Sequence, residues 1–190
     1  LLPLREAEAM PKKHYLTEAE WQALQLRLAD QSATMSVPRN VARQVVTRVD
    51  NRSIKATTGQ SFFLQKAVIW FGIIIANVLF VSTLIAIAYY FQWTATLGIP
   101  LVGAFWFIIA GFTGDQGSWV HGVVGAAIGL SLAAFMPAEY QVPVVLFTLS
   151  LWVHRLTYLL AQIWINKLIR TSFATYDMLV EHVEIHDPKQ

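Results

Sequence analysis

The sequence predicts an all-α integral membrane protein with four transmembrane helices and a small helical, cytoplasmic N-terminal region. Two long uncharged runs carry this prediction, because no Asp, Glu, Lys or Arg occurs from 67 to 114 or from 116 to 138. A membrane-spanning helix needs about 20 predominantly apolar residues. Only 14% of the chain is charged, against roughly 25% in a typical soluble domain. The predicted parts are an N-terminal region (1–60), a four-helix membrane domain (61–166) and a cytoplasmic tail (167–190).

The N-terminal region contains a capping-box pattern at Thr17 and Glu20. The Thr hydroxyl accepts a hydrogen bond from a free backbone N–H, and the Glu side chain reaches back to the cap. A helix should follow, with Trp21, Leu24 and Leu28 on one apolar face. A helix this short is unstable alone, so we expect this face to dock on a partner.

A Ser/Thr/Pro-rich break at 32–38 ends that helix, and a basic stretch at 39–55 follows. Val41, Val45 and Val49 favour a helix over a strand in the basic stretch. Basic residues beside a first span are expected from membrane topology. No aromatic residues interleave with them for base stacking, so the expected contact is the lipid bilayer and no nucleic acid.

Four hydrophobic segments follow, with short connections that predict antiparallel neighbours. A re-entrant hairpin made by the second and third segments is the alternative to two full spans. Lys and Arg gather before the first segment and after the fourth. Since positive charge stays in the cytoplasm, we expect both termini there, in a bacterial inner membrane. The predicted spans are about 67–91, 94–113, 119–136 and 142–165.

The fourth segment carries a polar stripe of Thr148, Arg155 and Gln162 at seven-residue spacing, with Tyr158 close to it and His154 beside Arg155. A charge inside a span is costly and should face other helices, a partner or water. Two alternatives are that Arg155 extends its charge to the headgroups or pairs structurally with a carboxylate.

Three other polar residues are candidates for roles inside the membrane. Asp115 and His121 flank the second connection, on the predicted cytoplasmic side, where they could meet Arg155 in a group suited to proton relay or anion binding. A loop Asp with an interfacial His is the alternative. Asn77, a lone amide in the first segment, is expected to hydrogen-bond across helices.

The third segment carries a small-residue face at Gly122, Gly125, Gly129 and Ala133. Small residues let membrane helices approach closely, so this face indicates helix packing, within the chain or in an oligomer.

His182 and His186 are four residues apart in the tail, and one helical turn would let them share a zinc ion. Their flanks do not match HExxH, so a solvated acidic tail is expected, with no metal and no cofactor.

No nucleotide-binding GxxxxGK[ST] and no GxSxG nucleophile motif occurs. Short loops, packing faces and soluble ends favour a non-catalytic structural or assembly subunit of a larger membrane complex, associated with other membrane subunits or with copies of itself. The first alternative is a small oligomeric channel or transporter with the fourth-segment stripe lining the path. The second is a membrane-embedded enzyme that uses Asp115, His121, His154 and Arg155.

Overall fold

The computed structural model describes residues 15–59, 61–115 and 119–186, without the side chains of 57, 58, 112–115 and 119–121. The chain is mostly helical, in agreement with the predicted class. Its helices and strands are α1 (Glu18–Ala29), β1 (Thr34–Ser36), α2 (Arg39–Arg48), α3 (Asn51–Thr58), α4 (Phe63–Phe91), α5 (Ala95–Asp115), α6 (Trp119–Ala134), α7 (Ala138–Thr171), α8 (Phe173–Leu179) and β2 (Glu184–His186), with short 3-10 turns at Gln92–Thr94 and Val180–His182.

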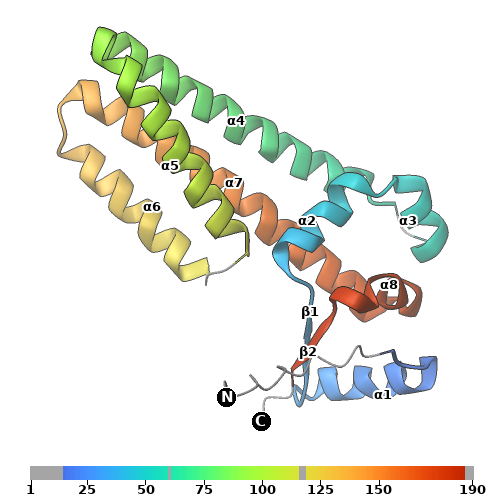
Figure 1. Ribbon diagram of the computed structural model, residues 1–190. Helices are drawn as coiled ribbons and strands as arrows, with labels where there is room; N and C mark the ends of the chain where they lie inside the picture. The colour runs from blue at the N-terminus through green and yellow to red at the C-terminus, as the bar shows by residue number, and fades with distance from the viewer. Residues whose placement is uncertain (1–14, 60, 116–118, 187–190) are drawn as a thin grey trace, which may run out of the picture.

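Helices α4 to α7 form an elongated bundle of two hairpins, α4 with α5 and α6 with α7, which both turn at the same end of the molecule (Figure 1). Two stretches are long and apolar enough to cross a membrane, Phe63–Gly111 with 49 residues and Ala138–Thr171 with 34. The first stretch contains α4 and α5 up to Gly111. Gly122–Ala134 of α6 is a shorter apolar helix. These helices point to membrane association, and the division into four spans stays a prediction.

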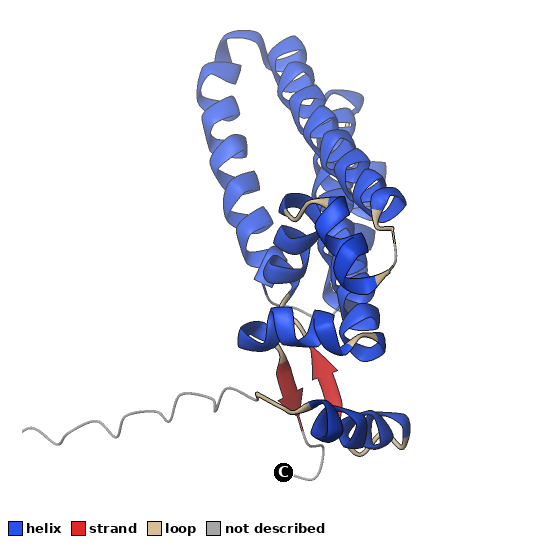
Figure 2. Ribbon diagram, turned by 90° about the vertical axis from the view of Figure 1, so that its right-hand side faces the viewer, coloured by secondary structure: helices blue, strands red, loops and turns tan. Residues whose placement is uncertain are grey.

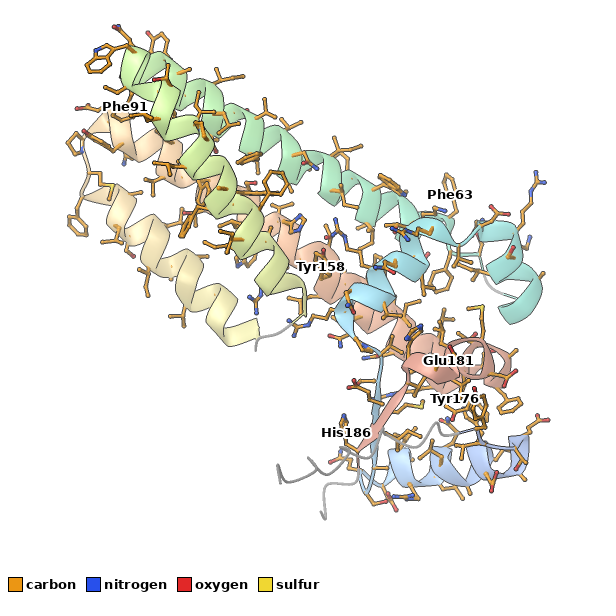
Figure 3. The ribbon with its side chains drawn as sticks, viewed as in Figure 1. Phe63, Phe91, Tyr158, Tyr176, Glu181 and His186 are labelled. Carbon is orange, nitrogen blue, oxygen red and sulfur yellow. The ribbon has the colours of Figure 1, made fainter. Side chains whose placement is uncertain are left out.

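The outer surface of the bundle is apolar. Large contiguous apolar surfaces on a protein mark contact with other proteins or with lipid. Figure 3 shows Phe63 and Phe91 at opposite ends of α4, with side chains projecting outward along the helix between them. The large apolar side chains exposed on α4, α5 and α6 include Trp70, Phe71, Ile74, Val78, Val81, Ile85, Leu97, Leu101, Phe105, Phe107, Ile108, Val124, Ile128 and Leu132.

The best-buried core lies at the opposite end from the hairpin turns, where both ends of the chain fold together. We call this part the terminal unit: α1, β1, α2, α3, the end of α7 from Ala161, α8 and β2. The strands lie between α1 and the helices nearer the bundle (Figure 2). Its buried core includes Leu24, Met35, Val37, Val46, Ile54, Phe62, Ile165, Ile169, Tyr176 and Leu179.

Local signals set the ends of several elements. The capping box at Thr17 and Glu20 is confirmed, with the Glu20 N–H bonded to the Thr17 hydroxyl and the Thr17 N–H bonded to the Glu20 carboxylate. Gly59 ends α3 at φ 71°, a left-handed conformation that glycine adopts without steric penalty. Ser172 caps α8 by accepting a hydrogen bond from the Thr175 N–H.

The chain after the fourth hydrophobic segment differs from the predicted solvated tail. α7 continues six residues beyond the predicted end at 165, to Thr171, and α8 and β2 follow. β2 pairs antiparallel with β1, so that Met35 lies opposite Ile185. The stretch 32–38, predicted as an irregular break, therefore contains a strand. Three residues are too few to show an alternating pattern, and the partner strand lies far away in sequence.

Candidate functional site

The polar stripe of α7 is packed against two glycines of α6 along its first half. A Cβ atom on Gly129 would lie 2.7 Å from the Oγ1 atom of Thr148, and one on Gly122 would lie 2.7 Å from the Nε atom of Arg155. Neither position has room for a side chain. Both pairs repeat at seven residues, so the small-residue face of α6 and the stripe of α7 pack in register.

The second half of the stripe holds the chain segment that contains β1. The Gln162 Nε2 atom donates to the Val37 carbonyl at 2.9 Å, and the Asn166 Oδ1 atom accepts from the Val37 N–H at 2.9 Å. One turn further on, the Arg170 guanidinium donates to the Met35 carbonyl at 3.2 Å. Three side chains on one face of α7 thus bind the main chain of the extended segment, and Val37 and Met35 are buried.

A second polar face of α7, which was not predicted from the sequence, connects three helices of the bundle. The Trp106 Nε1 atom of α5 donates to the Ser150 hydroxyl at 2.9 Å, which donates to the Ala76 carbonyl of α4 at 2.8 Å. Seven residues after Ser150, the Thr157 side chain lies so close to Gly72 of α4 that a Cβ there would come within 2.8 Å of it. The spacing of Ser150 and Thr157 is the sequence signal for this face.

His154 lies between aromatic rings where α5, α7 and α2 meet. Its ring is 5.2 Å from that of Trp106 and 5.4 Å from that of Tyr158. Arg43 of α2 stacks over Tyr158 at 4.2 Å, near the point where α2 crosses α7 in Figure 3. The Nδ1 atom of His154 is buried and has no hydrogen-bond partner among the described residues. This environment holds the imidazole mainly through ring contacts.

A groove opens between α5, α6 and α7, with a volume of about 320 Å³. Its walls are mostly apolar, and Arg155, only 8% exposed, is the charged residue that lines it. Gly125 borders the groove on α6. The side chains that line it are Ile109, Gly122, Gly125, Ala126, Phe147, Thr148, Leu151, Trp152 and Arg155.

Arg39, at the start of α2, lies near Arg155. Its Nε atom donates to the Gln162 side chain at 3.0 Å. Burial, and then the positive charge of Arg155, lower the pKa of the Arg39 guanidinium below its ordinary value. Two guanidinium groups therefore lie on the same side of α7, whereas the sequence predicted Arg39 only as part of the basic stretch.

The predicted group of Asp115, His121 and Arg155 stays a prediction, because the side chains of Asp115 and His121 lie outside the described residues. The Asn77 amide is exposed and donates to the Ile73 carbonyl of its own helix at 2.8 Å. A hydrogen bond of Asn77 across helices stays a prediction. A side-chain amide on a helix can donate a hydrogen bond to the carbonyl four residues earlier in the same helix. The presence of such an amide therefore does not identify a facing helix.

The four predicted packing residues of α6 divide into two groups. Gly122 and Gly129 lie against α7, and Ala133 is buried. Gly125 is exposed, and a Cβ there would meet nothing within 4 Å. The close approach thus follows the seven-residue spacing and does not include Gly125, which borders open space beside α7.

The face of α1 predicted to dock on a partner packs on the terminal unit. Leu24 is buried, Leu28 is partly buried, and the Trp21 ring lies 5.8 Å from Phe173 of α8. The same chain thus supplies the apolar surface that this short helix needs. Docking of another protein by these three residues stays a prediction.

His182 and His186 are not one helical turn apart, because a 3-10 turn ends at His182 and β2 contains His186. The His186 imidazole lies 3.5 Å from the Glu184 carboxylate. Among the described residues, no three His, Cys, Asp or Glu side chains gather as a metal site would require. Comparison of the chain with protein-family models, curated proteins and solved structures gives no match.

Proposed function

We propose that the protein is a four-span membrane protein of a bacterial inner membrane, with both termini in the cytoplasm. At 1.5 Å per residue, α5 is about 31 Å long, which suits a hydrocarbon core of about 30 Å. α4 and α7 are longer, and their additional length lies at the end that carries the terminal unit (Figure 1). That end also carries the basic residues of α2 and α3, whereas Tyr89, Tyr90 and Trp93 lie at the other end, as expected for an interface.

Within that membrane the proposed role is that of a non-catalytic structural or assembly subunit of a larger complex. The observation that carries the proposal is the fixed attachment of the terminal unit to a membrane helix. α7 is continuous over 34 residues, about 51 Å, and its Gln162, Asn166 and Arg170 side chains bind the segment that contains β1. A rigid helix joined to a folded unit outside the bilayer is suited to holding a bound partner at a fixed position relative to the membrane.

The outer side of α1 is the proposed docking face for the partner. α1 lies at the far end of the molecule from the hairpin turns, beyond the two strands (Figure 2). Its inner face packs on α8, which leaves Leu26 73% exposed on the outer side, with Tyr15 exposed just before the helix. Exposed apolar groups of this kind form the anchors of protein interfaces.

A conducting path along the α7 stripe is the alternative, and the contacts favour it less. Thr148 and Arg155 lie against glycines of α6, and Gln162 is bonded to Val37 and Arg39. Residues that line a path in an oligomer would instead face a shared axis. Catalysis by His154 and Arg155 is also less favoured, because aromatic rings pack on His154.

The proposal is tested by purifying the full chain in native-lipid particles and identifying the chains that accompany it. We expect different chains at fixed stoichiometry, and we expect Leu26→Asp to release them. Met178→Asp is the matched control, because Met178 is also an exposed apolar residue of the terminal unit. Particles that contain this chain alone would overturn the proposal, and a symmetric oligomer that conducts solutes in liposomes would support the channel instead.

A further inference from the structure

We propose that the groove between α5, α6 and α7 binds one anionic phospholipid, with an acyl chain along the apolar walls and the phosphate between Arg155 and Arg39. The inference takes the bundle to lie in a bilayer and is independent of the assembly role.

The size and lining of the groove suit an acyl chain. It extends along α7 from Phe147 to Arg155, a rise of about 12 Å. One leaflet of the hydrocarbon core is about 15 Å thick, half of the core's 30 Å. Gly125 leaves one wall without a side chain, and the preceding residue of α6, Val124, is exposed. The groove is therefore open to the surroundings of the bundle, where lipid chains lie.

The depth of the two arginines suits a phosphate at the membrane boundary. Arg155 lies thirteen residues after Val142, the predicted start of the span, which is about 20 Å into a core of about 30 Å. Arg39 is bonded to Gln162, a further seven residues along α7, or about 10 Å. A phosphate between them would thus lie near the hydrocarbon boundary on the side of the terminal unit.

The charges supply the complementarity. Arg155 lines the groove, and the Arg39 guanidinium is bonded to Gln162, seven residues further along α7, so two cationic side chains lie toward the same end of the groove. An anion between them accepts charge-assisted hydrogen bonds from both. Gly122 is needed for this arrangement, because a Cβ atom there would lie 2.7 Å from Arg155 Nε and 2.9 Å from Cδ.

Gly125→Leu tests the acyl-chain part. The new side chain has open space, since a Cβ at this position meets nothing within 4 Å, and it would fill the groove without displacing α7. The control is Gly103→Leu on α5, where a Cβ also meets nothing but the residue does not line the groove. Native mass spectrometry of the full chain should show bound phosphatidylglycerol lost in Gly125→Leu and kept in Gly103→Leu.

The phosphate part is tested by the ratio of phosphatidylglycerol to diacylglycerol retained, with identical acyl chains, because diacylglycerol lacks the phosphate. Wild type should prefer phosphatidylglycerol about tenfold, the factor expected for one charge-assisted hydrogen bond. Arg155→Gln should abolish the preference and Arg155→Lys should keep part of it. Arg39→Gln is the second variant should Arg155→Gln fail to fold, and it should also reduce the preference.

Several results would overturn the proposal. They are equal retention of the two lipids by wild type, wild-type lipid binding by Gly125→Leu, and displacement of the lipid by millimolar inorganic phosphate, which would indicate a free-anion site. A change of particle mass in Gly125→Leu, with lipid content unchanged, would identify another protein chain as the occupant.

Discussion

The hydrogen bonds that hold Val37 on α7 allow a quantitative test of how the terminal unit is attached. Asn166→Leu removes the acceptor of the Val37 N–H, which lies 2.9 Å from the Asn166 Oδ1 atom. Val37 is 0% exposed, so its N–H group, left without an acceptor, has no access to water. Leaving a buried donor unsatisfied costs about 1–3 kcal/mol. We expect the free energy of unfolding in detergent to fall by that amount.

Hydrogen exchange at the Val37 amide gives a local measurement of the same bond. This N–H is held by a side chain and not by a strand partner, so its exchange should accelerate in Asn166→Leu. Asn166→Asp is the matched control, because it keeps an oxygen at the acceptor position and should keep the amide protected. Lys167→Leu, an exposed neighbour on α7, should change neither quantity.

Gln162→Met extends the test to the Val37 carbonyl and to Arg39. The two single substitutions free the same segment, so the double variant should lose less than the sum of the two. Unchanged protection of the Val37 amide in Asn166→Leu, with stability within about 0.5 kcal/mol of wild type, would refute the attachment described above.

Three further perturbations address other contacts. Ser150→Ala breaks the link between α5 and α4, and we expect a loss of about 0.6–1.7 kcal/mol in unfolding free energy, the range for such bonds in membranes. Gly129→Leu forces a side chain onto Thr148 and should lower the Tm clearly. Hydrogen bonds from the backbone and then the hydroxyl of Thr17 hold the pKa of Glu20 below its ordinary value of 4.5. That contribution to α1 is fully present above pH 4.5 and is lost as the pH falls through the lower folded-state pKa, which helicity measured against pH should reveal.

Each of these predictions has a control in the same chain. Ser131→Ala changes an exposed hydroxyl of α6 and should be neutral, and Gly103→Leu on α5 enters open space and should leave the Tm unchanged. Glu18→Gln should preserve the pH profile, since the cap uses Glu20. Equal effects of a test variant and its control would contradict the assigned contact.

Periodic and local features were predictable from the sequence. The cap of α1 depends on two residues three apart, and the packing of α6 on α7 depends on two matching seven-residue repeats. Both arise within one or two helical turns, where sequence spacing fixes which side chains share a face. The GxxxG spacing also includes Gly125, where a Cβ would meet nothing within 4 Å, so a packing role for this residue stays a prediction.

Long-range pairing was not predictable in the same way. β1 and β2 have three residues each, too few for an alternating pattern to appear. The hydrogen bonds of Gln162 and Asn166 go to the main chain of Val37. Nearly every residue has the same main-chain N–H and C=O groups, so the sequence does not show which residue makes such bonds. The groove also depends on how α5 and α6 diverge, which no single-helix pattern encodes.

The pairing of β1 with β2 has a consequence for the order in which the protein matures. Thr34 pairs with His186 and Ser36 with Glu184, so the second strand leaves the ribosome about 150 residues after the first. At about 5–20 residues per second, the strand that is made first waits roughly 8–30 s for its partner. All of the hydrophobic helices are synthesised in that interval. The two strands can pair only when the helices between them have brought both to the same end of the bundle. Pairing of β1 with β2 therefore reports that both hairpins have folded in their correct directions.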